Sequence, residues 1–172
     1  MAKNIGKRFE ENWKNSIPEN IFYYRPNDAA QSFDKNIKNS TLRFSAKSPC
    51  DCFLFTGNVF YTLELKSVGT SSISFEKTKE EHGIIHKHQI DSLLKFSTYK
   101  NVVSGFLFDF RLSGKTYFCM IEEFKHMIDH LNKKSFNEKD LYEWCNPIII
   151  QKKKLRTNYR YDVEEFLRDT NL

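Results

Sequence analysis

The chain has 172 residues, 40% of them hydrophobic and 28% charged, which suits one soluble domain with a single core. No apolar run approaches the roughly 20 residues of a membrane-spanning helix, and the N-terminal segment lacks the apolar stretch of a signal peptide. We therefore expect a cytoplasmic protein with no membrane partner. The 27 Lys and Arg exceed the 22 Asp and Glu to give a net charge of +5, which suits a polyanionic partner without identifying one.

Helical spacing of apolar residues marks the N-terminal segment, where Ile5, Phe9 and Trp13 form one stripe. This predicts a helix over 4–16, which ends before a proline. The segment 26–49 that follows is polar and only weakly periodic. Such a long insertion in a small domain is typical of a functional segment.

The next part of the chain is rich in β-forming residues. Segments 50–56 and 58–67 flank a turn at Gly57, which predicts a β-hairpin. Segment 68–83 is polar and is expected to form a loop. Apolar residues then recur at helical spacing, which predicts a helix over 86–99.

The second half of the chain alternates between strand and helix patterns. It is expected to form strands at 101–111 and 115–121, helices at 122–131 and 137–144, a short strand at 147–150 and a final helix from Asp162. This order predicts one α/β domain spanning 1–172, with a central mixed β-sheet flanked by helices.

The four cysteines are Cys50, Cys52, Cys119 and Cys145. A zinc site needs paired spacings that this set lacks, because only the first two residues are close in sequence. Reduced, structural cysteines are expected in a cytosolic protein.

The residues that indicate chemistry are Asp51 and the run Glu64-Leu65-Lys66. Side chains of a strand alternate between its two faces, so Glu64 and Lys66 share one face. If Asp51 meets Glu64 across the hairpin, two carboxylates and an ammonium group gather at one edge of the sheet. The alternative is a surface Glu–Lys pair with an unrelated aspartate nearby.

Two carboxylates with the backbone carbonyl of Leu65 form a hard oxygen site that suits Mg²⁺, with Mn²⁺ as a substitute ion. A bound Mg²⁺ lowers the pKa of a water molecule and neutralises charge that builds up on a phosphodiester. Lys66 would orient the attacking water or stabilise the developing charge. The pattern therefore indicates phosphodiester hydrolysis.

The same residues resemble a known family. Asp51 followed by Glu64-Leu65-Lys66 resembles the PD-(D/E)xK motif of the restriction-endonuclease-like superfamily, although Cys50 separates Pro49 from Asp51. The run Gly6-Lys7-Arg8-Phe9-Glu10 resembles the G-x-x-(F/L)-E opening of the RecU-type Holliday junction resolvases within that superfamily.

Further elements of the RecU family follow in the same order along the chain. Ser74-Phe75 and His88-Gln89-Ile90 resemble its S-F and H-Q-I elements, and the stretch from Ile148 to Asp162 resembles its ending. The resemblance implies a restriction-endonuclease-like fold and a homodimer that cuts two opposing strands of a four-way DNA junction. It also implies that 26–49 takes the place of the family's stalk, which enters the junction, and it makes a recombinase a candidate further partner.

The resemblance also implies roles for individual residues. The catalytic set would be Asp51, Glu64, Lys66, Glu10 and Gln89, and the metal ligands would be Asp51, Glu64 and Leu65. Basic residues near the stalk and in the C-terminal run are expected to contact DNA phosphates. These are Arg25, Arg43, Lys47, Lys152, Lys153, Lys154, Arg156 and Arg160.

Two other functions remain open from the sequence. One is a sequence-specific or nicking DNA nuclease of the same fold, which the E-x-K run supports equally well. The other is a non-catalytic DNA-binding factor of recombination, which would hold if the carboxylates do not converge or do not bind a metal ion.

Overall fold

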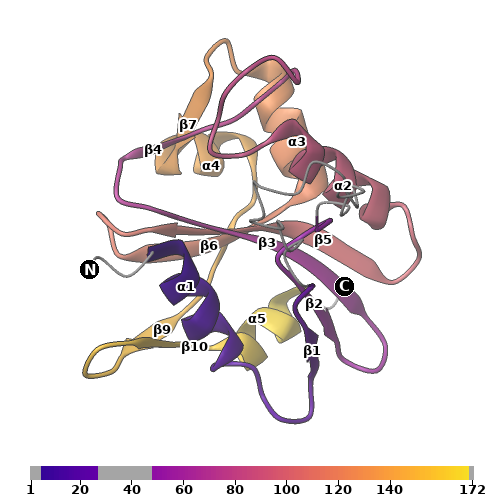
Figure 1. The fold of residues 1–172 in the computed structure, drawn as a ribbon, viewed down its shortest axis with the longest axis vertical. Coiled ribbons are helices and arrows are strands. Elements are labelled where there is room, and N and C mark those ends of the chain that lie inside the picture. Colours follow the sequence, from indigo (N-terminus) through magenta and orange to yellow (C-terminus); the bar gives the residue numbers. More distant parts are fainter. Residues whose placement is uncertain (1–4, 27–47, 171–172) are drawn as a thin grey trace, which may run out of the picture.

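The computed structural model of the protein describes residues 5–26 and 48–170 (Figure 1). Segment 27–47, which holds most of the predicted stalk-like insertion together with Arg43 and Lys47, lies outside the described residues.

The central feature is a six-stranded β-sheet with the order β1-β2-β3-β5-β6-β8. β3 and β5 run parallel to each other, and the other neighbouring strands are antiparallel. A parallel pair requires a crossover connection, which residues 69–101 provide. The strands are β1 (Phe22–Tyr24), β2 (Cys52–Phe55), β3 (Phe60–Val68), β5 (Val102–Phe110), β6 (Lys115–Met120) and β8 (Ile148–Ile149).

Helices cover both faces of the sheet (Figure 1). One face is covered by α2 (Lys87–Ser97), α3 (Ile121–His130) and α4 (Glu138–Trp144), and the other by α1 (Ile5–Lys14) and α5 (Val163–Thr170). Two small antiparallel sheets complete the described residues. They pair β4 (Ser72–Ser74) with β7 (Ser135–Asn137) and β9 (Lys152–Lys154) with β10 (Tyr159–Tyr161).

Alternation along β5 supplies the core on both sides. Phe106 and Phe108 point toward α3, where their rings lie 4.7 and 5.7 Å from that of Phe124. Leu107 points to the other face and packs in the cluster that contains Trp13 of α1. Because both faces are buried, the central strands are apolar on both sides. Glu64, a charged residue of β3, therefore lies in the interior.

The α/β class with a central mixed sheet flanked by helices, predicted from the sequence, is confirmed. The five predicted helices and the hairpin of β2 and β3 are present, and Gly57 adopts a positive φ of 95° in its turn. The prediction that 68–83 is wholly a loop was wrong, because it contains β4. The strands β1, β7, β9 and β10 were not predicted.

All four cysteines are free thiols, as expected, and three of them are buried. Among the residues that the structure describes, no helix is long and apolar enough to cross a membrane.

Candidate active site

The candidate site lies where β3 continues beyond β2. β2 pairs with β3 only as far as Leu63, so in the described part of the chain no strand lies beside the second half of β3 on that side. Asp51, the residue before β2, occupies the first open position. Its N–H donates to the carbonyl of Leu63 at 3.1 Å, and its Oδ2 accepts the N–H of Leu65 at 2.8 Å. The carboxylate of Asp51 thus accepts the Leu65 N–H that a backbone carbonyl of a neighbouring strand would otherwise accept.

Glu64 is the centre of the cluster. Its side chain is only 3% exposed, under α2, and its Oε1 accepts hydrogen bonds from Lys66 Nζ at 2.9 Å and from Gln89 Nε2. The Oε1 of Gln89 in turn accepts the N–H of His86 at 2.9 Å. The orientation of this amide is therefore fixed, with its NH₂ group directed at Glu64.

The surroundings of Glu64 raise the pKa of its carboxyl group. Burial raises the pKa of the Glu64 carboxyl to about 7; the Lys66 ammonium lowers it, and the neighbouring Asp51 carboxylate raises it again. The same negative charge reaches the adjacent thiols. Burial first, and then Glu64 and Asp51, raise the pKa of Cys50. Asp51 thus lies close enough to Glu64 to affect its pKa, and Lys66 forms an ion pair with Glu64.

These residues fit a hard divalent cation. Asp51 and Glu64 supply carboxylate oxygens. A bound cation would offset both the burial of the Glu64 carboxylate and the neighbouring charge of Asp51, which together raise the pKa of Glu64. The N–H and C=O of one strand residue point to the same side, so the Leu65 carbonyl shares the direction of the N–H that Asp51 accepts. Within 5–26 and 48–170, no group of three or more His, Cys, Asp or Glu is arranged to hold a metal ion. Mg²⁺ retains several waters and needs few protein ligands.

A second carboxylate, Glu76, holds the start of α2 in place. Its oxygens accept hydrogen bonds from His86 Nδ1 at 2.7 Å, from the N–H of Lys87 at 2.9 Å and from the N–H of Gly83 at 3.2 Å. Burial would raise the pKa of Glu76, but these hydrogen bonds lower it to about 2. No sequence pattern indicates this role, because two of the three donors are backbone groups. Glu76 therefore fixes the turn from which Gln89 projects.

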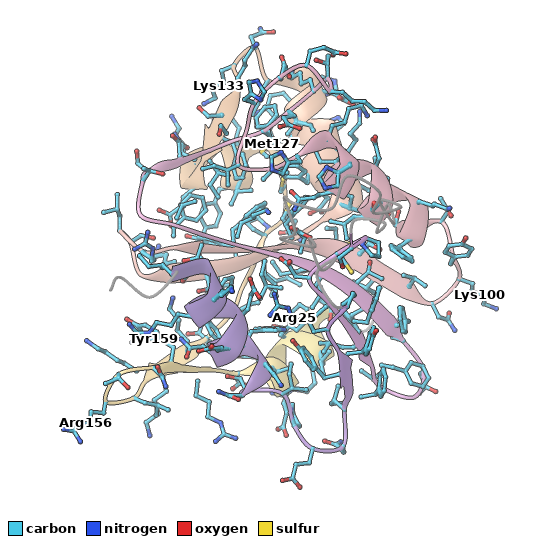
Figure 2. All side chains as sticks on the ribbon, viewed as in Figure 1. Arg25, Lys100, Met127, Lys133, Arg156 and Tyr159 are labelled. Carbon is cyan, nitrogen blue, oxygen red and sulfur yellow. The ribbon has the colours of Figure 1, made fainter. Side chains whose placement is uncertain are left out.

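Glu10 and Arg25 form an ion pair with 2.6 Å between Oε2 and Nη2 (Figure 2 labels Arg25). Both groups influence the pKa of Tyr23 on β1, which burial raises first. Glu10 also contributes to raising the pKa of Cys52, after burial, Cys50, Asp51 and Glu64. Glu10 therefore lies near enough to Tyr23 and Cys52 to affect their pKa values, and Arg25, predicted to contact DNA, is its ion-pair partner.

The predicted basic run forms the β9–β10 hairpin, and its members differ in position. Lys152 is 11% exposed and lies 2.7 Å from Asp109 Oδ1, so its ammonium group belongs to a buried ion pair. The other four, Lys153, Lys154, Arg156 and Arg160, are exposed.

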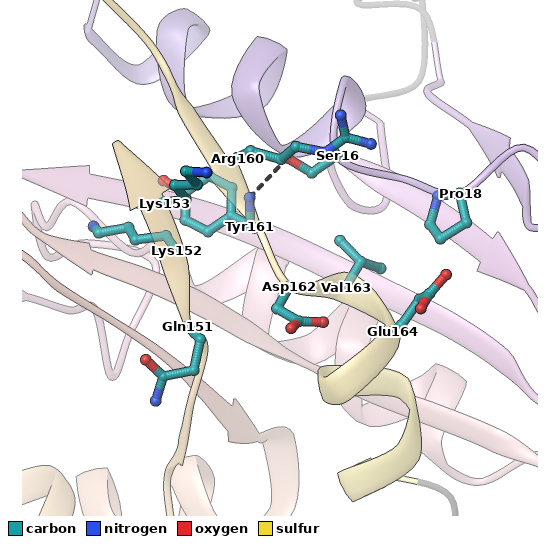
Figure 3. A pocket seen from close by; sticks show the side chains of 10 residues that line it. All are labelled: Ser16, Pro18, Gln151, Lys152, Lys153, Arg160, Tyr161, Asp162, Val163 and Glu164. Carbon is teal, nitrogen blue, oxygen red and sulfur yellow. Dashed lines mark hydrogen bonds between the residues drawn. The ribbon is translucent and has the colours of Figure 1, made fainter. Parts of the chain in front are cut away.

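The hairpin is attached to α1. Figure 3 shows the hydrogen bond from the Tyr161 N–H to Ser16 Oγ, 2.9 Å long, at a pocket of about 490 Å³ that Lys153 and Arg160 also line. The two exposed cations of this pocket thus lie away from Glu64, on the face of the sheet that α1 covers.

Fold and site together define an α/β protein with a buried carboxylate–lysine–glutamine cluster at an open strand edge. No protein-family model matches the chain. It is 32% identical over 172 residues to the SPbeta prophage-derived uncharacterized protein YotM of Bacillus subtilis (strain 168), a match that covers 93% of this chain and 83% of the relative. The chain belongs to the family of that protein.

One solved structure with a similar chain path is that of Hjc, a Holliday junction resolvase from the archaeal hyperthermophile Archaeoglobus fulgidus. The TM-score is 0.47 and the sequence identity 16%, with 81% of this chain and 93% of that chain covered.

Proposed function

We propose that the protein is a divalent-metal-dependent endonuclease that cleaves branched DNA, with four-way junctions as its substrate and a homodimer as its working form. The observation that carries the proposal is the cluster at β3, where Lys66 and Gln89 both contact one oxygen of Glu64 beside Asp51. Burying a glutamate beside a second carboxylate costs free energy. Ionisable groups in such surroundings are concentrated at functional sites, which supports a functional role for this cluster.

The residues can divide the work of hydrolysis. Asp51 and Glu64 would hold Mg²⁺ or Mn²⁺, which when bound supplies a water of lowered pKa and positive charge beside the phosphate. Lys66, held by Glu64, would donate hydrogen bonds to the attacking water or to the phosphate oxygens. The attacking water releases a proton to solvent as its oxygen forms the new bond to phosphorus. The bond to the leaving sugar oxygen breaks, and that oxygen takes up a proton.

Gln89 has a more restricted part. Because its Oε1 accepts the His86 N–H, the amide can offer only its NH₂ group to the site. It would hold Glu64 with one hydrogen and direct the other at a water or phosphate oxygen. Glu76 acts one step further away, by holding the N-terminus of α2 from which this amide extends.

Selectivity for a branch is proposed for segment 26–49. The described residues that flank it lie beside the site, because β1 pairs with β2 and Asp51 directly precedes β2. A projection from this position could sense an opening between DNA arms by shape, without reading bases. The resemblance to the RecU stalk supports this assignment.

A non-catalytic DNA-binding protein is the second candidate. It is favoured by the way in which Lys66 and Gln89 already satisfy Glu64, and by the absence of a third acidic ligand among residues 5–26 and 48–170. In that case the cluster would be a buried ion pair of structural value alone.

The test compares a synthetic four-way junction with a linear duplex of the same sequence, in Mg²⁺, in Mn²⁺ and in EDTA. The proposal predicts metal-dependent cuts in two opposing junction strands, lost in Glu64→Gln and retained in Glu164→Gln, a change at an exposed glutamate of α5. Equal cutting of the duplex would indicate the sequence-specific or nicking nuclease. Junction binding without any cutting would indicate the non-catalytic protein.

A further inference from the structure

A basic surface lies on the face of the sheet opposite Glu64. A hollow of about 880 Å³ lies between α1, the β5–β6 turn and the β9–β10 hairpin. Three structural elements place four cations around it: Arg8 on α1, Arg111 in the turn, and Lys154 and Arg156 on the hairpin. All four side chains are exposed. Figure 2 shows Arg156 and Tyr159 on the hairpin at this end of the molecule.

The charge of the hollow is strongly positive. Within the described ranges, none of the four cations has an acidic group within salt-bridge distance. The single acidic residue of the lining is Asp109, which is neutralised by Lys152 at 2.7 Å. Asp109 also accepts hydrogen bonds from Ser67 at 2.9 Å and Thr116 at 3.0 Å. The negative charge of Asp109 is therefore compensated within the protein and does not offset the four exposed cations.

The cations are mounted on rigid supports. The Lys152 ammonium lies 5.0 Å from the ring centre of Tyr159 and 5.7 Å from that of Tyr161, which links the two strands of the hairpin. Its ion pair with Asp109 joins the hairpin to β5. The Tyr161 ring also contacts Phe9 of α1, at 5.6 Å between centroids. Arg111 packs on Gly69, where any Cβ would overlap its guanidinium group. The backbone segments that carry the cations therefore need little reordering when a ligand binds.

Taking the proposed function as its basis, we propose that this hollow binds the sugar-phosphate backbone of a DNA arm other than the strand cut at Glu64. Three of the four cations are arginines, whose planar guanidinium groups match phosphate oxygens. Lys66 and Ser67 are consecutive on β3 and point to opposite faces, so the hollow lies behind the cluster. A four-way junction offers arms on both sides of a cut, whereas a single phosphate or nucleotide would engage only one of the three elements.

The experiment compares three variants of the full chain. Arg8→Gln/Arg111→Gln/Arg156→Gln removes three charges from the hollow, and the triple Arg→Lys variant at the same positions keeps them. Three exposed lysines elsewhere provide the matched control, Lys95→Gln/Lys100→Gln/Lys139→Gln; Figure 2 shows Lys100 at the far side from Arg156. Junction affinity is measured in EDTA between 50 and 200 mM salt, and cleavage is measured in Mg²⁺.

Each lost phosphate contact should lower the slope of log K against log salt by about 0.9. Between 50 and 200 mM salt, the wild type, the triple Arg→Lys variant and the Lys→Gln control should therefore each lose roughly 40-fold more affinity than the triple Arg→Gln variant. The single-turnover cleavage rate at saturating DNA should be unchanged in the Lys95→Gln/Lys100→Gln/Lys139→Gln control. If the triple Arg→Gln variant kept the wild-type salt slope while the wild type cut the junction, the proposal that the hollow binds DNA would be refuted. The proposed nuclease activity would still stand.

Two further results separate this proposal from others. If the wild type does not cut DNA but its salt slope depends on the three arginines, DNA binding at the hollow is supported and the proposed nuclease activity is refuted. Polyglutamate that displaces the junction at equal charge concentration, and does so only when the arginines are present, would instead mark an acidic protein segment as the ligand and overturn the proposal.

Discussion

The raised pKa of Glu64 makes stability depend on pH in a defined direction. The ordinary carboxyl value is 4.5 and the folded-state value is about 7, so the folded state binds the proton more tightly than the unfolded chain. Glu64 therefore favours folding fully below pH 4.5, and that contribution is lost as the pH rises to about 7. The difference corresponds to roughly 3 kcal/mol at 1.36 kcal/mol per pH unit.

The assay is urea unfolding in EDTA at pH 5, 6, 7 and 8 for the wild type, Glu64→Gln and the control Glu164→Gln. Between pH 5 and 8 the wild type and the control should lose about 2.5 kcal/mol more stability than Glu64→Gln, whose amide does not titrate. Millimolar Mg²⁺ should restore most of this loss at pH 8, because a divalent cation favours the ionised carboxylate. Parallel pH profiles for Glu64→Gln and the wild type in EDTA would refute the electrostatic description of the cluster.

Four other predictions follow from the site and the fold. Lys66→Ala should slow single-turnover cleavage by about 10²-fold or more at saturating DNA, and an unchanged rate would make this lysine a bystander. Asp51→Asn should abolish cleavage and keep junction binding in a gel-shift assay; full activity would remove the metal assignment. Gly105→Ala should lower the free energy of unfolding by about 1–3 kcal/mol in urea, because its Cβ would overlap the Cys119 carbonyl, and an unchanged midpoint would contradict that crowding. Deleting 28–40 should reduce the preference for junction over duplex in a gel-shift assay far more than it reduces general DNA affinity, and an unchanged preference would refute the stalk assignment.

Local patterns predicted the parts of the site that lie close in sequence. Strand alternation placed Glu64 and Lys66 on one face, and the hairpin register brought Asp51 beside them. The burial of that face was not predicted, because its cover comes from α2 and from phenylalanines of β5 that lie some 40 residues away. The contact of Gln89 with Glu64 depends on the crossover for the same reason.

The C-terminal basic run shows a second limit. Lys152-Lys153-Lys154 has no apolar alternation, so nothing local indicated a strand or singled out one lysine as buried. Lys152 differs from its neighbours because Asp109, 43 residues earlier, and two tyrosine rings create a place for its ammonium group. The role of Glu76 could not be predicted from the sequence, because backbone N–H groups, which carry no sequence signature, are among its partners.

The parallel pairing of β3 with β5 has a consequence for the order in which the protein folds. Asp51 reaches Leu65 through a tight hairpin with few residues to close, whereas Gln89 reaches Glu64 only after the crossover 69–101 has been ordered and α2 has docked. Contacts across long loops form late, because loop closure costs entropy before any contact repays it. In the partly folded chain the two carboxylates would therefore stand together in water, without the amide and the cover of α2. A chain arrested at that stage would hold its acidic pair but would lack the enclosed surroundings that give Glu64 its raised pKa.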